Sequence, residues 1–155
     1  EPERRLHNSL LSEALTDIWR EQYDLAQENL TFLLEQDPTD ARGWYYRGYA
    51  RAMSGKRKLA LIDYENAVYF EPANAEARFS LGFSYALLHR IPDARQQVAM
   101  LESLDSAMAQ RLRMVVDAVA ESNHESGPAE HEAAQTPESP VTAPPAAPAP
   151  ESPPR

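Results

Sequence analysis

The chain has 155 residues, a formal charge of −9 and no cysteine. This length suits one domain with a hydrophobic core rather than two. The lack of cysteine excludes disulfides and cysteine-ligated zinc, and the acidic balance offers no basic footprint for nucleic acid. No apolar run approaches the roughly 20 residues that span a bilayer. We therefore expect neither nucleic-acid binding nor direct membrane insertion by this chain.

The chain begins at Glu1 without a methionine, and no signal peptide is visible. We expect that an upstream segment was removed, and a lost signal peptide, a lost membrane anchor and simple trimming all stay open. The localisation is therefore unknown. Cytoplasm and periplasm are equally compatible with the sequence, as is a membrane tether through a missing N-terminal segment.

After a lead-in of residues 1–6, the sequence aligns with itself when position 7 is placed on position 41 and position 41 on position 75. The aligned segments are 7–40, 41–74 and 75–108. The first two close near Pro38 and Pro72, which predict the end of a helix. Asp40 and Asn74 follow these prolines, and their side-chain oxygens can cap the helix that comes next. We therefore expect a repeat that begins and ends at the same place in each segment.

Each repeat contains two amphipathic stretches of about 12–15 residues with apolar positions at i, i+3, i+4 and i+7. Gly48 and Gly82 recur in register, as do Ala60 and Ala94, where small side chains let helices cross closely. Residues 106–120 predict one further helix, which caps the stack. The sequence thus predicts an all-α solenoid of about seven antiparallel helices over residues 7–120.

The composition changes at Glu121, and nine of the thirteen prolines lie between Pro128 and Pro154. Such a segment has too few apolar side chains to offset its ordering entropy. Residues 121–155 are therefore predicted to form a disordered tail rich in Pro, Ala and Glu. Residues 137–140 and 145–148 match the P-x-x-P form of proline-rich ligands, although we favour a solvated spacer.

The repeats resemble the tetratricopeptide-repeat (TPR) family over residues 7–108. The middle repeat carries the resemblance best, with Trp44, Gly48, Ala60, Tyr64, Ala67 and Pro72. The third repeat keeps Leu81, Gly82, Tyr85, Ala94 and Val98, but has Ser106 where the family has a proline. The first repeat is the most degenerate. The resemblance implies an α-solenoid that binds other proteins.

In that family the first helix of each repeat lines a concave groove, and its exposed positions meet the ligand. The residues at the matching positions are Leu11, Leu15, Tyr45, Tyr49, Phe79 and Phe83, with Met53 and Leu87 one turn further. Pairs spaced i, i+4 point the same way. A second apolar stripe on an open face indicates a site for an amphipathic helix or an extended apolar segment. The alternative is that some members are ordinary core residues.

The family also contains a carboxylate clamp of Lys and Asn residues, which grips the C-terminal Glu-Glu-Val-Asp of chaperones. The corresponding positions here hold Leu11, Leu15, Tyr45, Tyr46 and Phe79. We therefore do not expect this specificity.

Two sets of charged residues suggest further contacts. Glu13 and Asp17 lie one repeat before Arg47 and Arg51, and corresponding side chains on stacked helices are neighbours. We hypothesise Glu13–Arg47 and Asp17–Arg51 ion pairs that fix the register of the first two repeats.

Residues 42–58 contain no acidic residue. The basic residues Arg42, Lys56, Arg57 and Lys58 form a candidate docking patch for an acidic partner or for the acidic tail, and a solvated turn is the alternative.

No motif indicates catalysis. The chain has no H-E-x-x-H, no Gly-rich phosphate loop and no G-x-S-x-G, and its four histidines lack metal-ligand spacing. We expect no enzymatic activity, no metal site and no cofactor.

The leading interpretation is a protein-binding adaptor or scaffold with a hydrophobic groove. By analogy with short TPR modules, we place it in a larger assembly of bacterial secretion or polysaccharide export, with membrane association left open. One alternative is a chaperone that shields apolar segments of secreted or membrane proteins. Another is a self-associating TPR oligomer, in which the first repeat exposes Leu6, Leu10 and Leu11 to a second copy.

Overall fold

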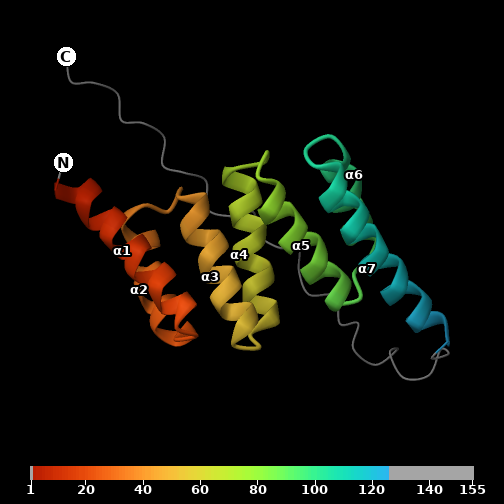
Figure 1. Cartoon of the computed structure of the whole chain (residues 1–155), viewed down its shortest axis with the longest axis horizontal. Coiled ribbons are helices and arrows are strands. Elements are labelled where there is room, and N and C mark those ends of the chain that lie inside the picture. The colour runs from red at the N-terminus through yellow and green to blue at the C-terminus, as the bar shows by residue number, and fades with distance from the viewer. Residues whose placement is uncertain (1, 126–155) are drawn as a thin grey trace, which may run out of the picture.

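A computed structural model of the chain describes residues 2–125, which form seven α-helices and no strand. The helices are α1 (Pro2–Trp19), α2 (Tyr23–Gln36), α3 (Ala41–Met53), α4 (Arg57–Phe70), α5 (Ala75–Leu87), α6 (Ile91–Glu102) and α7 (Ser106–Glu125). Loops of three or four residues join them, so consecutive helices run antiparallel, and the helix pairs follow one another along the long axis of the molecule (Figure 1). The predicted all-α solenoid is confirmed, whereas the predicted disorder of residues 126–155 lies outside the described residues.

The helices begin and end near the prolines and capping residues that the sequence indicates. α2 ends at Gln36 before Pro38, and α4 ends at Phe70 before Pro72. The Asp40 carboxylate accepts hydrogen bonds from the backbone N–H groups of Arg42 and Gly43 at the start of α3. The Asn74 side chain accepts one from the N–H of Ala77 at the start of α5. These bonds satisfy N–H groups that have no partner within the helix.

The turn inside each repeat contains a left-handed residue at the same place. The positive φ angles are 60° at Glu21, 76° at Gly55 and 56° at His89, and these positions align in the three repeats. Only Gly55 adopts this backbone without a steric cost from a β-carbon. The repeat thus keeps its turn geometry even where it lacks the glycine.

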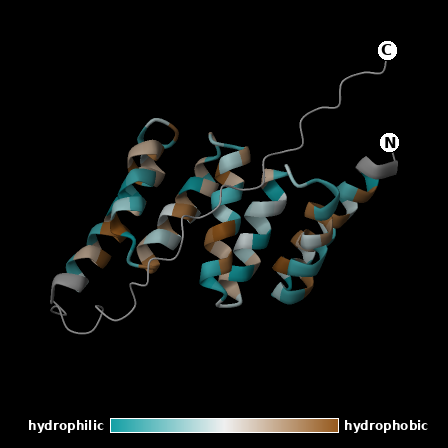
Figure 2. Ribbon diagram, turned by 180° about the vertical axis from the view of Figure 1, so that it is seen from behind, coloured by the Kyte–Doolittle hydropathy of each residue, from teal (hydrophilic) through white to brown (hydrophobic). Residues whose placement is uncertain are grey.

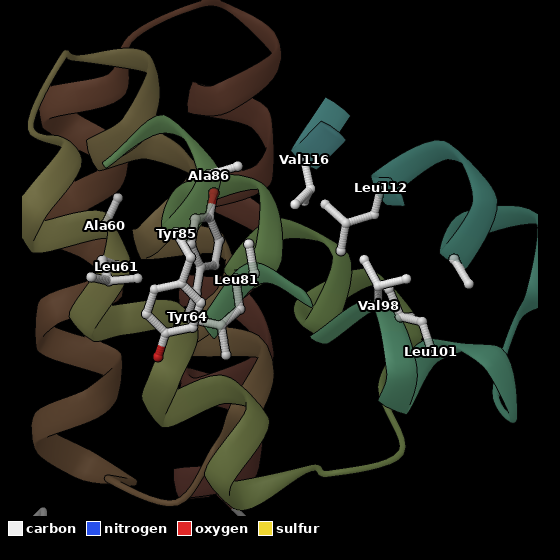
Figure 3. Packing of buried hydrophobic residues seen from close by; sticks show 12 residues of the cluster. Ala60, Leu61, Tyr64, Leu81, Tyr85, Ala86, Val98, Leu101, Leu112 and Val116 are labelled. Atoms are coloured by element: carbon white, nitrogen blue, oxygen red, sulfur yellow. The ribbon is translucent and has the colours of Figure 1, made fainter. Parts of the chain in front are cut away.

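Two groups of buried apolar side chains form the core. The first lies among α1, α2 and α3, and the second runs from α4 to α7. Figure 2 shows hydrophobic and hydrophilic positions alternating along the helices, as expected for amphipathic helices. Figure 3 shows Tyr64, Leu81 and Tyr85 of the second group together, with Leu112 and Val116 reaching in from α7.

Glycine permits the close helix contacts that the sequence predicts. A β-carbon at Gly82 would lie 2.4 Å from a methyl group of Leu112 and 2.9 Å from the β-carbon of Gln97. At Gly48 it would lie 3.0 Å from the ring of Tyr64. The role of these two glycines is confirmed.

Two predicted boundaries need correction. α1 begins at Pro2, so the expected lead-in of residues 1–6 is helical from its second residue, because proline is favoured in the first turn of a helix. α7 continues to Glu125 rather than ending at residue 120, since no glycine or proline occurs before Gly127. Within residues 2–125, no helix is long and apolar enough to cross a membrane.

The self-association alternative predicted that Leu6, Leu10 and Leu11 are exposed, and this is wrong for two of the three residues. Leu10 and Leu11 are buried in the first core group, and only Leu6 is exposed. The exposed positions of α1 between them are polar, namely Asn8, Ser9, Ser12 and Glu13. Around the buried Leu10 and Leu11, α1 therefore exposes polar side chains rather than an apolar surface for a second copy.

Candidate protein-binding groove

A groove of about 320 Å³ lies between α3 and α5, with α4 behind it. Among the described helices, α5 packs closely against α7, whereas α1 and α3, like α3 and α5, share few close backbone contacts. The lining residues are Tyr49, Ala52 and Met53 of α3, Arg57, Ala60 and Tyr64 of α4, and Phe79, Ser80, Phe83, Ser84 and Leu87 of α5. We call this hollow the α3–α5 groove.

The groove exposes large apolar side chains from both walls. Tyr49 and Phe83 are each 38% exposed, and Met53 and Leu87 are also exposed. The rings of Phe79 and Phe83 stack with centroids 6.4 Å apart and planes 12° apart. A soluble protein normally buries such side chains, so a contiguous set in a hollow indicates a binding surface.

Tyr45 and Phe79 form the inner part of the same wall. Both are half-buried and pack against the second core group. The Tyr45 ring lies 6.0 Å from the ring of Tyr64. Burial raises the pKa of Tyr45 and of Tyr64, so both phenols stay protonated at neutral pH and present no charge to the groove.

Five of the eight predicted groove residues line this hollow, and a sixth, Tyr45, lies beside it. Leu11 and Leu15 do not. Leu11 is only 8% exposed and Leu15 is half-buried, and both belong to the core around α1, α2 and α3. Their placement in the groove was wrong, because both side chains of α1 turn into this core and neither lines the hollow.

Trp19 is absent from the predicted groove residues, yet it shares their register. It lies one repeat before Met53 and two repeats before Leu87, and it is 90% exposed at the end of α1. The alignment of the repeats is the signal that could have found it. No comparable signal marked Ser80 or Ser84, whose place in the wall follows only from the packing of α5.

The hypothesised ion pairs are also wrong. Arg47 donates to both oxygens of Asp63, at 2.9 and 3.2 Å, and Arg51 donates to the same carboxylate at 2.9 Å. Asp63 is fully buried. Burial raises its pKa, and the two guanidinium groups oppose that shift by favouring the charged form.

The acidic partner of these arginines therefore comes from α4 of the same repeat rather than from α1. Glu13 instead accepts a hydrogen bond from Ser9, and Asp17 accepts one from Asn29 at 2.9 Å. Asn29 and Asp63 are one repeat apart. In both repeats the residue at this position of the second helix bonds a polar or charged residue of the first helix. This shared position is the sequence signal that could have predicted the pairs.

The four basic residues do not form one patch. Arg42 lies at the start of α3 and bonds Asp40 at 3.1 Å, about 20 Å along the helix from Lys56 at the far end. Lys56 pairs with Asp24 of α2 at 3.1 Å. Arg57 lines the α3–α5 groove, whereas Lys58 is exposed outside it.

A larger hollow of about 1160 Å³ lies where α1, α3 and the ends of α2 and α4 meet. Its charged groups are engaged with each other, since Asp40 contacts His7 at 2.6 Å and Arg42 at 3.1 Å. No group of three or more metal-ligating side chains occurs in residues 2–125. The chemistry of this hollow is that of a satisfied polar cluster, so the exposed apolar wall of the α3–α5 groove is the better candidate site.

A scan of the sequence against protein-family models finds no match, and a search of curated proteins finds no matching sequence. Solved structures do match. The type III secretion chaperone SycD of Yersinia enterocolitica, in complex with a peptide of the translocator YopD, is 16% identical with a TM-score of 0.67, over 75% of this chain and 93% of SycD.

Two further structures are TPR domains by description. The Sgt2 TPR domain of Aspergillus fumigatus is 21% identical with a TM-score of 0.69, over 81% of this chain and 87% of that one. The first TPR of Spaghetti (RPAP3), bound to an HSP90 peptide, is 19% identical with a TM-score of 0.68, over 75% and 94%. These likenesses confirm that the chain has the TPR fold, and at such identities they show the fold alone.

Proposed function

We propose that this chain is a protein-binding module that holds an apolar segment of a partner protein in the α3–α5 groove. The observation that carries the proposal is the exposed aromatic and aliphatic wall formed by Tyr49, Met53, Phe83 and Leu87. The volume of about 320 Å³ is at the lower end of the range for ligand pockets. It has room for a few anchoring side chains, while the rest of the segment lies across the rim.

The likeness to peptide-bound TPR structures supports the proposal. SycD is bound to a translocator peptide and RPAP3 to an HSP90 peptide, so this fold accommodates protein segments of different chemistry. The present groove fits an apolar segment better than a C-terminal carboxylate, because aromatic and aliphatic residues fill the clamp positions. The anchors would be apolar side chains seated against Phe79 and Phe83.

Site-specific photo-crosslinking tests this proposal in the cells that make the protein. A photoreactive phenylalanine analogue replaces Phe83 in the groove, and in a matched chain it replaces Ile62, which is exposed on α4 and does not line the groove. We expect a crosslinked protein from position 83 and none from position 62. Crosslinking from position 62 alone would place the site on the other face.

A groove variant provides the second arm of the same test. Tyr49→Ser with Phe83→Ser removes two rings that are already partly exposed, so circular dichroism should show an unchanged fold. The photoreactive analogue then stands at Met53, which keeps the groove labelled. Loss of the crosslinked partner in this variant supports the groove, and retention contradicts it.

A chaperone that shields apolar segments of client proteins is the second candidate function, and the likeness to the chaperone SycD favours it. An adaptor in a secretion or polysaccharide-export assembly would give one dominant crosslinked partner. A chaperone would give several unrelated apolar clients. Neither function includes a catalytic step.

A further inference from the structure

We infer that the α3–α5 groove selects a segment in which an acidic residue flanks the apolar side chains, and that Arg57 recognises this residue. The inference rests on the proposed function, since it assigns the chemistry of the segment that the groove holds. It makes Arg57 a specificity-determining residue rather than a member of a general basic surface.

Arg57 is the only charged residue in the lining of the groove. It is the first residue of α4 and lies where α3 and α5 end, beside Met53 and Leu87. Its side chain is exposed, and within residues 2–125 it forms no ion pair and no side-chain hydrogen bond. The first turn of α4 contains no acidic residue. No carboxylate of this chain's described part therefore neutralises the cation.

The neighbouring cations differ from Arg57 in ways that isolate its role. Lys56 is engaged by Asp24 and Gln27 of α2 at 3.1 and 3.0 Å. Lys58 is exposed but does not line the groove. Of three consecutive basic residues, only Arg57 is both unpaired and placed to meet a bound segment.

A second cation stands at the opposite end of the apolar wall. The Arg111 guanidinium of α7 lies 5.3 Å from the centre of the Phe79 ring, and Phe79 precedes Leu87 by about 12 Å of helix. The groove is thus lined by one cation, Arg57, and by no acidic residue, whereas Glu76, which lies near Tyr45, accompanies Arg111 at the far end.

Charge complementarity decides between candidate segments. A neutral apolar segment gains only the apolar contacts, and a lysine next to the anchors is repelled by Arg57. An aspartate or glutamate gains a charge-assisted hydrogen bond at the rim. A contact of this kind adds modest affinity. It discriminates between peptides because a basic residue at the same place is repelled while an acidic residue is attracted.

A random peptide library displayed on phage, selected against the full 155-residue chain, tests the inference. We expect enriched peptides to combine aromatic or aliphatic residues with an adjacent Asp or Glu. An enriched peptide is then synthesised with that acid and with Gln in its place. The acidic form should bind about fivefold more tightly, which is the range of a partly exposed ion pair, and the advantage should shrink in high salt.

Variants of the chain assign the preference to one residue. Arg57→Gln should abolish the roughly fivefold advantage of the acidic peptide and leave the Gln peptide unaffected. Arg57→Glu should reverse the preference toward a lysine-containing peptide. Lys58→Gln is the matched control, because it removes an adjacent exposed cation outside the groove, and it should leave the advantage intact.

Several outcomes would overturn the inference. The inference fails if peptides need Tyr49 and Phe83 for binding but show no preference for an acidic residue. It also fails if Lys58→Gln and Arg57→Gln reduce the advantage of the acidic peptide equally. A synthetic peptide of residues 126–155 that displaces the selected peptide only when Arg57 is present would identify the chain's own acidic segment as the occupant instead. Binding that is unchanged by Tyr49→Ser with Phe83→Ser would count against the proposed groove itself, so the two failures are distinguishable.

Discussion

The interface between α1 and α3 and the interface between α3 and α5 are formed by residues at the same positions of the repeat. They differ in how far these residues are exposed. At the first interface, Leu11 of α1 is buried and Leu15 is half-buried in the core among α1, α2 and α3, although Trp19, one repeat before Met53, is exposed. At the second interface, Tyr49 and Met53 of α3 line an open groove together with residues of α5. Leu11 and Leu15 of the first interface correspond to Tyr45 and Tyr49, which hold the same places one repeat later.

Side-chain bulk gives one reason for this difference. In the first interface, leucines of α1 meet α3, and branched aliphatic side chains allow close packing. In the second, Tyr45 and Tyr49 of α3 are matched in register by the rings of Phe79 and Phe83 of α5. Rings on both helices need more room than the narrow space between adjacent helices supplies, and part of each outer ring is left exposed.

A polar contact between α1 and α3 is the second reason for the difference between the two interfaces. His7 of α1 contacts Asp40, the N-cap of α3, at 2.6 Å. The residues one repeat later are Ala41 and Asn74, which cannot form the same contact, and Asn74 bonds Glu71 within its own loop. The shared repeat positions therefore determine the fold. A few side chains determine whether residues at an interface between repeats are buried or line a groove.

The largest effect we expect comes from breaking the ion cluster that joins α3 to α4. Asp63→Ala strands Arg47 and Arg51, of which Arg47 is buried. The free energy of unfolding should fall by roughly 3–5 kcal/mol, the range for a buried charge that loses its partner. Urea unfolding of the variant measures this.

Glu13→Ala is the matched control for the rejected Glu13–Arg47 pair. Glu13 is exposed and bonds only Ser9, so its removal should change stability by no more than about 0.5 kcal/mol. Equal losses in the two variants would mean that the carboxylate of Asp63 is not the main partner of these arginines.

The next prediction concerns the other face of α5, where α7 closes the solenoid. Gly82→Ala places a methyl group 2.4 Å from Leu112, which is fully buried, and 2.9 Å from the β-carbon of Gln97. Overpacking should cost about 1–3 kcal/mol, although alanine is intrinsically the better helix former by about 1 kcal/mol.

Adding Leu112→Ala tests the cause of that loss. The double variant should lose less than the sum of the single losses, since the atom that clashes is gone. Additive losses, measured by urea unfolding, would contradict a clash at this position.

The register, the helix ends and the close contacts could be predicted from the sequence because each depends on one residue type in a repeated place. Pro38 and Pro72 stop helices, Asp40 and Asn74 start them, and Gly82 admits Leu112. These are local effects, and a repeated sequence shows them more than once.

The groove and the ion cluster depend on which helices touch, and register alone does not determine that. Arg47 has candidate acids on α1 and on α4, and only the packing of α3 against α4 selects Asp63. Leu11 is apolar and in register with Tyr45, but it is buried in the core that α1 forms with α2 and α3. The first error assigned to the neighbouring repeat a contact that the structure makes within one repeat, and the second took a buried position for an open one.

Exchanging side chains between the interfaces tests the role of bulk directly. Leu11→Phe forces a ring into the closed interface and should lower stability by about 1–2 kcal/mol. Phe83→Leu changes a side chain that is already 38% exposed and should cost less than about 1 kcal/mol. Urea unfolding of both variants measures the asymmetry, and equal losses would show that the two interfaces are equally packed.

The smallest effect we expect is a pH dependence of the first interface. Burial disfavours the Asp40 carboxylate, but hydrogen bonds from Arg42 and the contact with His7 outweigh it and hold the pKa of Asp40 below its ordinary 3.8. A lowered pKa in the folded state contributes stability above the unfolded pKa. That contribution is lost as the pH falls through the folded pKa.

Asp40→Asn keeps a capping side chain but removes this titration. Between about pH 5 and pH 2 the wild-type chain should therefore lose stability more steeply than Asp40→Asn, whereas Glu28→Gln, which alters an exposed carboxylate on α2, should follow the wild type. Parallel unfolding curves for all three would show that the Asp40 carboxylate adds no pH-dependent stability. The equivalent position in the second interface is Asn74, which does not titrate, so acid should loosen the closed interface and leave the α3–α5 groove unchanged.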